Sequence, residues 1–194
     1  MTLRHKVPAG ALLMAAVPLL GFLAACKSPT QDEVRAALEV VELKSTWVAK
    51  DYRQWPQPRL VLVPKIEFRV RNKTAEPLQY INFNAVFKKK GSVENLGDNF
   101  LAAVRKTPIP PGGLSEVITL KSNFGVEGRT LEQFKLLPQE LTYDVKIFAQ
   151  FQGSRHALLG EWAVSRDIDF KEDQPVHMEG KKIGKTEASK PDQK

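Results

Sequence analysis

Residues able to carry out covalent or acid–base chemistry are few in this 194-residue chain, which contains one cysteine and three histidines. Cys26 has no second cysteine with which to form a disulfide, so its thiol is free for another reaction. His5 and His177 lie near the two ends of the chain. Only His156 lies in the central part, where an imidazole could act as a base near neutral pH. The chemistry of the chain therefore depends on Cys26 and His156.

His156 follows Gly153-Ser154-Arg155, a sequence that predicts an exposed hairpin turn. A Ser–His–Asp triad built on His156 would be the chemistry of a hydrolase, but no nucleophile-elbow motif accompanies it. We therefore predict a non-enzymatic protein without catalytic residues, and a hydrolase is the least favoured alternative.

Metal ligands are also sparse. Zinc sites need histidine and cysteine side chains at close spacing, and His156 is the single such residue in the central part of the chain. Calcium needs clustered oxygen ligands. The nearest approach to such a cluster is a group of four carboxylates: Asp167, Asp169, Glu172 and Asp173. Arg166 and Lys171 balance these charges, so the sequence predicts no metal site, and nothing in it indicates a cofactor.

Cys26 directly follows an unusual N-terminal segment. The first six residues carry two basic side chains and no acidic one, and Val7 to Ala25 contains no charged side chain. A basic head followed by an apolar stretch is the layout of a secretory signal. A retained transmembrane helix is the alternative, because the apolar run is nearly long enough to span a bilayer. Pro18 and Gly21 interrupt the run and favour the signal.

The segment ends in Leu23-Ala24-Ala25-Cys26, which resembles the lipobox of bacterial lipoproteins at all four positions. In that family a diacylglycerol is attached to the cysteine thiol, and a peptidase that recognises the lipobox cuts before the cysteine. The resemblance implies that Leu23, Ala24 and Ala25 are recognised by the peptidase and that Cys26 carries acyl chains such as palmitate. Several chains make the anchor effectively permanent, since one chain binds membranes only marginally.

The same resemblance implies a location in the cell envelope. In enteric lipoproteins an aspartate directly after the lipidated cysteine holds the protein in the inner membrane. Lys27 occupies that position here, which favours the periplasmic face of the outer membrane. Without residues 1–25 the formal net charge falls from +7 to +5, a surplus that is spread along the chain. It suits a protein near anionic head groups and does not indicate a nucleic-acid partner.

Composition divides the chain into four segments. Residues 1–25 are the predicted signal peptide, 26–30 a short lipidated tether, and 31–170 a single folded domain. Residues 171–194 mix charged residues with proline and glycine and contain only isolated apolar side chains. Such a segment cannot bury enough apolar surface to offset its ordering entropy, so we predict a disordered polar tail.

Apolar residues alternate with polar ones through much of 31–170. Ile66, Phe68 and Val70 show this pattern, and the run from Ile81 to Phe87 repeats it. Further candidate strands lie near 40–50, 99–106, 115–123, 141–152 and 158–168. Seven short strands separated by turn signals predict an all-β fold, a seven-stranded antiparallel immunoglobulin-like sandwich.

Two short helices are expected within this fold. Thr30 and Glu33 form a capping box, after which apolar residues recur at helical spacing. Thr130 and Gln133 are placed to cap a second helix that Pro138 would end. This second helix would direct three apolar side chains inward: Leu131, Phe134 and Leu137.

Two further resemblances concern the body of the domain. The first covers about residues 65–125, which look like the FxLYD-type and related immunoglobulin-like domains of bacterial lipoproteins. The residues that carry this resemblance are Val70-Arg71-Asn72-Lys73-Thr74, Ile81, Phe83, Phe87, Gly91 and Ile109-Pro110-Pro111-Gly112. The other is that Leu136 to Tyr143 resembles the tyrosine corner of fibronectin type III domains, with one residue more than usual between Pro138 and Tyr143. The first resemblance implies an extracytoplasmic sandwich and carries no catalytic residues. The second implies that the Tyr143 hydroxyl bonds back to the upstream backbone and fixes the crossing between the sheets.

Aromatic residues supply the candidate partner-binding site. Tyr52 and Trp55 lie between Asp51 and Pro58, in a predicted loop bounded by prolines, where exposed aromatics can bind a partner. The leading functional hypothesis is a lipid-anchored, non-enzymatic cell-envelope module that acts through protein–protein contacts in envelope assembly or maintenance. The alternative is a carrier that binds a lipid or another apolar ligand between its sheets. An envelope hydrolase is the third hypothesis.

Overall fold

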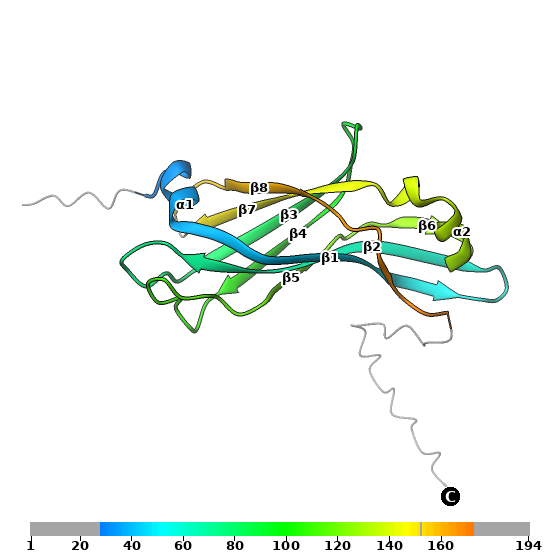
Figure 1. Cartoon of the computed structure of the whole chain (residues 1–194), viewed down its shortest axis with the longest axis horizontal. Helices are drawn as coiled ribbons and strands as arrows, with labels where there is room; N and C mark the ends of the chain where they lie inside the picture. Colours follow the sequence, from blue (N-terminus) through cyan, green and yellow to red (C-terminus); the bar gives the residue numbers. More distant parts are fainter. Residues whose placement is uncertain (1–27, 152, 173–194) are drawn as a thin grey trace, which may run out of the picture.

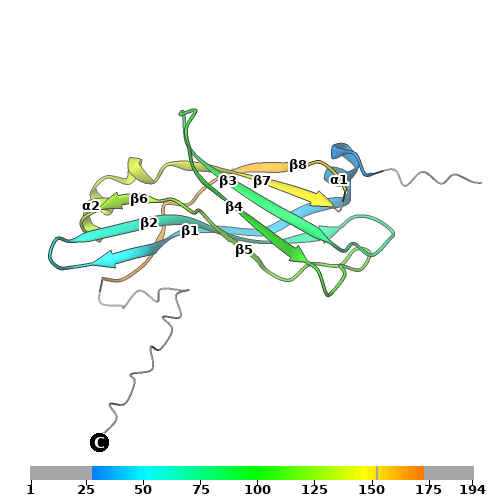
Figure 2. The same ribbon diagram turned by 180° about the vertical axis from the view of Figure 1, so that it is seen from behind.

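Two β-sheets packed face to face form the body of the chain (Figures 1 and 2). The computed structural model describes residues 28–151 and 153–172. The predicted signal peptide and lipobox therefore lie outside the described residues, as does the predicted tail from 173 onward. The elements in chain order are α1 (Gln31–Ala37), β1 (Leu38–Arg53), β2 (Arg59–Asn72), β3 (Ile81–Lys89), β4 (Asn95–Val104), β5 (Ile118–Lys121), β6 (Val126–Gly128), α2 (Leu131–Leu136), a 3-10 turn (Pro138–Leu141), β7 (Tyr143–Phe151), β8 (Ala157–Ala163) and β9 (Ile168–Asp169).

The first sheet has the strand order β5-β2-β1-β9, with β6 also paired to β2, and the second has the order β4-β3-β7-β8. All pairs are antiparallel except the two-residue pairing of β1 with β9. The predicted all-β sandwich with two short helices is confirmed. The described part has nine strands where the sequence predicted seven, because β6 and β9 are too short to leave a periodic pattern. Each forms by pairing with a longer strand: β6 pairs with β2, and β9 pairs with β1.

Aromatic side chains fill the space between the sheets. Phe68 of β2 and Phe83 of β3 meet edge to face with ring centroids 5.6 Å apart. Trp47 of β1 and Tyr143 of β7 meet in the same way at 5.4 Å. Each pair joins one sheet to the other, and all four side chains are buried. Burial of such side chains contributes roughly 1.5–3 kcal/mol each, so these contacts are a main source of sandwich stability.

Helix α1 lies at one end of the sandwich, where the described chain begins (Figure 1). Its predicted capping box is present: Thr30 Oγ1 accepts from the Glu33 N–H at 3.2 Å, and Glu33 Oε2 accepts from the Thr30 N–H at 2.7 Å. Arg35 Nε donates to the Leu158 carbonyl at 3.0 Å, which ties the helix to β8. Within the described residues, no helix has the length and apolar character needed to cross a bilayer.

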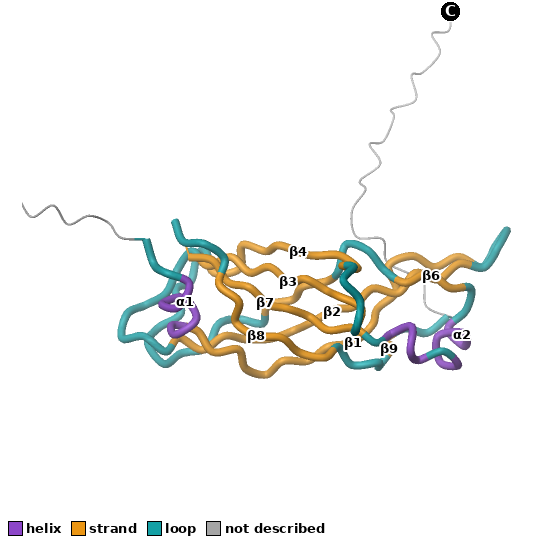
Figure 3. The backbone as a smooth tube through the Cα atoms, turned by 90° about the horizontal axis from the view of Figure 1, so that it is seen from above, coloured by secondary structure: helices purple, strands orange, loops and turns teal. Residues whose placement is uncertain are grey.

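Helix α2 lies at the opposite end, beside the β1–β2 hairpin (Figures 1 and 3). Thr130 caps it by accepting from the Gln133 N–H, as predicted. Phe134 is buried, but the prediction that Leu137 packs inward is wrong, since Leu137 is 41% exposed. The helix ends at Leu136, and Leu137 leaves helical geometry before the prolyl turn, so its side chain no longer follows the helical period.

Candidate functional site

The β1–β2 hairpin is the longest structural unit of the molecule and reaches the end opposite to α1 (Figures 1 and 3). Its strands pair as far as Arg53 and Arg59, which leaves a loop of residues 54–58. The predicted loop from Asp51 to Pro58 is therefore shorter than expected, because Asp51, Tyr52 and Arg53 continue β1. At a rise of about 3.3 Å per residue, the 16 residues of β1 extend about 50 Å.

Tyr52 contributes to the structure of the hairpin. Its ring meets the ring of Phe170 edge to face, with centroids 5.0 Å apart. Its hydroxyl accepts a hydrogen bond of 2.7 Å from Gln54 Nε2. The side chain is partly buried against the core. Of the two predicted partner-binding residues, Tyr52 therefore holds the C-terminal end of the fold against the base of the loop.

Trp55 is the exposed member of the predicted pair. Its side chain is 84% exposed at the tip of the hairpin. Indole is a large apolar surface, and exposed tryptophan is strongly enriched among residues that dominate protein–protein binding. The structure thus separates the two predicted residues: Tyr52 packs inward and Trp55 faces solvent.

Exposed ion pairs tie the hairpin to β6. Arg59 lies 2.8 Å from a carboxylate oxygen of Asp51 and 2.8 Å from one of Glu127. The hydrogen bond and charge of Glu127 raise the pKa of Arg59. In return, the hydrogen bond from Arg59 lowers the pKa of the Glu127 carboxyl, against a smaller opposing effect of desolvation. The pair with Asp51 joins the two strands of the hairpin, and the pair with Glu127 joins the hairpin to β6.

Two further apolar side chains lie at the same end of the sandwich. Leu136 is 73% exposed and Leu137 is 41% exposed, both at the C-terminal end of α2. Together with Trp55 they define what we call the distal apolar set. The sequence did not point to these leucines, because helical spacing assigned Leu137 to the core and gave no sign that the helix ends one residue earlier. Pro138 is expected to end the helix, and the residue before a proline is itself disfavoured in helical geometry, so this signal applies to Leu137 as well.

The residues considered for acid–base or metal chemistry are not members of the distal apolar set, although Glu172 bonds to the start of the helix that carries Leu136. His156 is exposed between β7 and β8, and its carbonyl accepts from Gln31 Nε2 at 2.7 Å. Asp167 accepts a hydrogen bond of 2.6 Å from Ser165 Oγ. Glu172, assigned by sequence to the tail, accepts from the Leu131 N–H at the start of α2. Within residues 28–151 and 153–172, no three His, Cys, Asp or Glu side chains gather to hold a metal ion.

No known protein family matches the sequence, and no curated protein matches it either. Several solved structures share part of the arrangement. The structural-genomics target SoR45 is 10% identical with a TM-score of 0.41, and the match covers 74% of this chain and 99% of that one. A protein assigned as ApaA from Bordetella pertussis is 12% identical with a TM-score of 0.36, over 69% and 95% of the two chains. A protein from Archaeoglobus fulgidus is 10% identical with a TM-score of 0.32, over 66% and 98%. Similarity this weak says nothing about what the present chain binds.

Proposed function

We propose that this protein is a lipid-anchored, non-enzymatic module of the bacterial cell envelope that binds a partner protein through the tip of its β1–β2 hairpin. Cys26 is the proposed anchor, on the periplasmic face of the outer membrane. Trp55 is the proposed central contact of the partner site, and Leu136 and Leu137, exposed at the same end of the sandwich, are proposed outer contacts. Contacts of this kind serve the assembly or maintenance of an envelope complex.

The observation that carries the proposal is the position of Trp55 relative to α1. The described chain starts at the α1 end, and Trp55 lies at the opposite end of the sandwich (Figure 1). Residues 27–30 reach at most about 14 Å when extended, so an anchor on Cys26 keeps the α1 end close to the membrane. With β1 perpendicular to the membrane, the hairpin would present an exposed tryptophan about 50 Å from that surface.

The filled interior favours this proposal over the carrier. A carrier would hold its apolar ligand between the sheets. That space is occupied by the rings of Phe68 and Phe83, in contact at 5.6 Å, and by Trp47 and Tyr143. Displacing such buried rings would cost several kcal/mol, which an apolar ligand would have to repay.

Photo-crosslinking in the producing bacterium tests the partner site. We expect p-benzoylphenylalanine at position 55 of the full chain to give one reproducible covalent product with another envelope protein. Val93 is the matched control, because it is 90% exposed on the different hairpin between β3 and β4. A product of the same mass from both positions, or none from position 55, would contradict the proposal.

Cell fractionation tests the anchor separately. We expect the unaltered chain in the outer-membrane fraction in its shortened, processed form. Without lipidation the peptidase has no substrate, so Cys26→Ser should keep residues 1–25, migrate as the longer form and be absent from the outer membrane. Metabolic labelling with radioactive palmitate should mark only the chain with Cys26. A Cys26→Ser chain that is shortened like the original chain and still lies in the outer-membrane fraction would show that another segment provides the attachment.

A further inference from the structure

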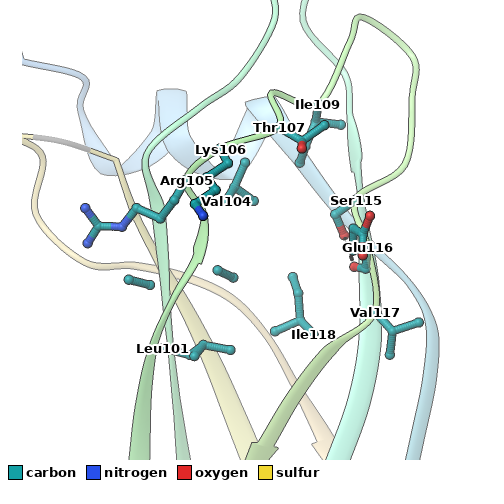
Figure 4. A pocket seen from close by; sticks show the side chains of 12 residues that line it. Leu101, Val104, Arg105, Lys106, Thr107, Ile109, Ser115, Glu116, Val117 and Ile118 are labelled. Atoms are coloured by element: carbon teal, nitrogen blue, oxygen red, sulfur yellow. Dashed lines mark hydrogen bonds between the residues drawn. The ribbon is translucent and has the colours of Figure 1, made fainter.

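A groove with a volume of about 540 Å³ opens between the edges of the two sheets, on the side of β4 and β5 (Figure 4). We call it the edge groove. Four inward-facing apolar residues line it: Leu101, Val104, Ile109 and Ile118. Figure 4 shows Leu101 and Ile118 reaching toward each other from opposite sides, whereas Arg105 points away. Three of the four apolar residues also belong to the buried core, so the groove opens onto the interior of the sandwich.

Irregularities on both sides keep the edge groove open. In β4, Ala102 pairs with Asn82 and Val104 with Ile81, so Ala103 is an extra residue that forms a β-bulge. Opposite, Ser115 Oγ accepts from the Val70 N–H at 3.0 Å in place of a backbone carbonyl. Regular pairing with β2 then resumes only at Ile118. The two edges separate there, while further along Asn99 Nδ2 still donates to the Lys121 carbonyl at 2.7 Å.

Leu101 shows that the core is incompletely covered at this place. It pairs with Phe83, whose side chain is fully buried, and directly opposed residues share one face of a sheet. Leu101 therefore faces the interior, yet it is 38% exposed. Among the described strands, β4 pairs only with β3, so the backbone of its other edge has no strand partner around Leu101. Unpaired edges that lack lysine and proline are templates for another strand.

We propose that the edge groove receives an extended segment of a partner protein, which adds a strand to β4. Side chains alternate across a strand, so every second residue of the segment would point into the groove and cover Leu101. The lining of the groove is mainly aliphatic. The segment is thus expected to carry small aliphatic side chains at alternate positions. This is a second surface, separate from the hairpin tip.

The charged residues at one end of the groove indicate which charge the bound segment should carry there. Lys106 is exposed beside the end of β4, and Arg105 Nη2 donates to Asn82 Oδ1 at 3.4 Å. Glu116 is the one carboxylate in the groove lining. Because Arg105 points away from the groove, Lys106 is the cation that a bound segment would meet at this end, and we expect an aspartate or glutamate of the segment beside it.

A second copy of this chain fits the edge less well. Pairing of β4 with β4 across a two-fold axis would run antiparallel. It would place the two α1 ends at opposite ends of the dimer, whereas attachment through Cys26 puts both in one membrane. Only this argument against a second copy rests on the proposed anchor at Cys26. The choice of a partner segment as the occupant depends on that argument.

A phage-displayed library of random twelve-residue peptides, selected on the purified full chain, tests the proposal. We expect enriched peptides to alternate aliphatic residues and to contain aspartate or glutamate. Leu101→Lys should weaken their binding by about tenfold or more, because the apolar contact is lost. Ala163→Lys is the matched control, since it places the same charge on β8, the other edge strand of the same sheet. Selection on Lys106→Glu should enrich basic peptides instead.

Hydrogen exchange distinguishes strand addition from other docking. An enriched peptide should slow exchange of the backbone amides in residues 100–105 without affecting those of β8. The proposal is overturned if no peptide is enriched, if Leu101→Lys and Ala163→Lys bind equally well, or if exchange in β4 is unchanged. Sedimentation of the free chain as a dimer that Leu101→Lys dissociates would assign the edge to a second copy. None of these readouts involves Trp55, so the hairpin proposal stands or falls independently.

Discussion

A buried polar side chain joins the loops at the α1 end of the sandwich, whereas the ion pairs at the hairpin end are exposed. At the α1 end, Asn72 is fully buried and bonds to the loops on both sides of it. The Lys73 N–H donates to the Ala37 carbonyl, which joins these loops to α1. At the hairpin end, Arg59 bonds to two carboxylates at the surface. Buried neutral hydrogen bonds resist salt and pH, and surface ion pairs do not. We therefore expect the α1 end to contribute more to the stability of the fold than the hairpin end does.

Among the variants considered, Asn72→Ala should lower the free energy of unfolding most, because it removes the buried hydrogen bonds at the α1 end. The Asn72 amide donates to the Glu76 and Ile109 carbonyls at 2.7 and 2.9 Å, and its oxygen accepts from the Thr74 N–H at 2.8 Å. Leaving these groups without partners should lower the free energy of unfolding by about 3 kcal/mol. Urea unfolding followed by circular dichroism measures this. Asn95→Ala, at an exposed position, is the control and should change it little; equal losses would remove the distinction between the two ends.

The aromatic contact at the hairpin end should contribute less to the free energy of unfolding. Tyr52 and Phe170 meet at 5.0 Å, and both are only partly buried. We expect a double-mutant cycle of Tyr52→Ala and Phe170→Ala to give a coupling energy of about 1 kcal/mol. Unfolding of the two single variants and the double variant supplies the cycle. Additive losses would mean that Phe170 does not hold the hairpin.

Local sequence signals predicted the part of the fold in which one face of a strand is buried. Alternation in Ile66–Val70, Ile81–Phe87 and Tyr143–Ala149 corresponds to β2, β3 and β7, whose inward residues are buried in the structure. The helix caps at Thr30 and Thr130 were also predicted, since capping depends on residues three apart. Trp55 was correctly placed in a loop.

Features that depend on distant pairing were not predictable. Tyr52 was placed in a loop because prolines follow it, but pairing with Leu60 extends β1 through it. Pro64 would argue against a central strand. It lies between the part of β2 that pairs with β6 and the part that pairs with β5, so the strand continues through it. The edge groove likewise depends on a bulge at Ala103, for which the sequence has no local sign.

Acid should weaken the hairpin end before the α1 end. The pKa of the Glu127 carboxyl is lowered from its ordinary value of 4.5 by the hydrogen bond from Arg59. A carboxyl whose pKa is lowered by folding stabilises the folded state above that ordinary value, and the contribution is lost as the pH falls through the folded pKa. Glu127→Gln should therefore be slightly less stable than the original chain at pH 7, and the difference should vanish at pH 3. Glu132→Gln is the control, and a difference that persists at pH 3 would show that the ion pair is not its cause.

Trp55→Ala should have the smallest effect on stability and the largest on partner binding. An indole that is 84% exposed contributes little to folding, so the free energy of unfolding should change by less than about 0.5 kcal/mol. If the partner nevertheless no longer co-purifies with the full chain, the side chain is retained for binding rather than for folding. Leu136→Ala, at the other side of the same end, should weaken co-purification less, because leucine is a less frequent hot-spot residue than tryptophan. A clear loss of stability in Trp55→Ala would instead show that the indole stabilises the fold. The two ends of the sandwich would then differ only in how deeply their polar groups are buried.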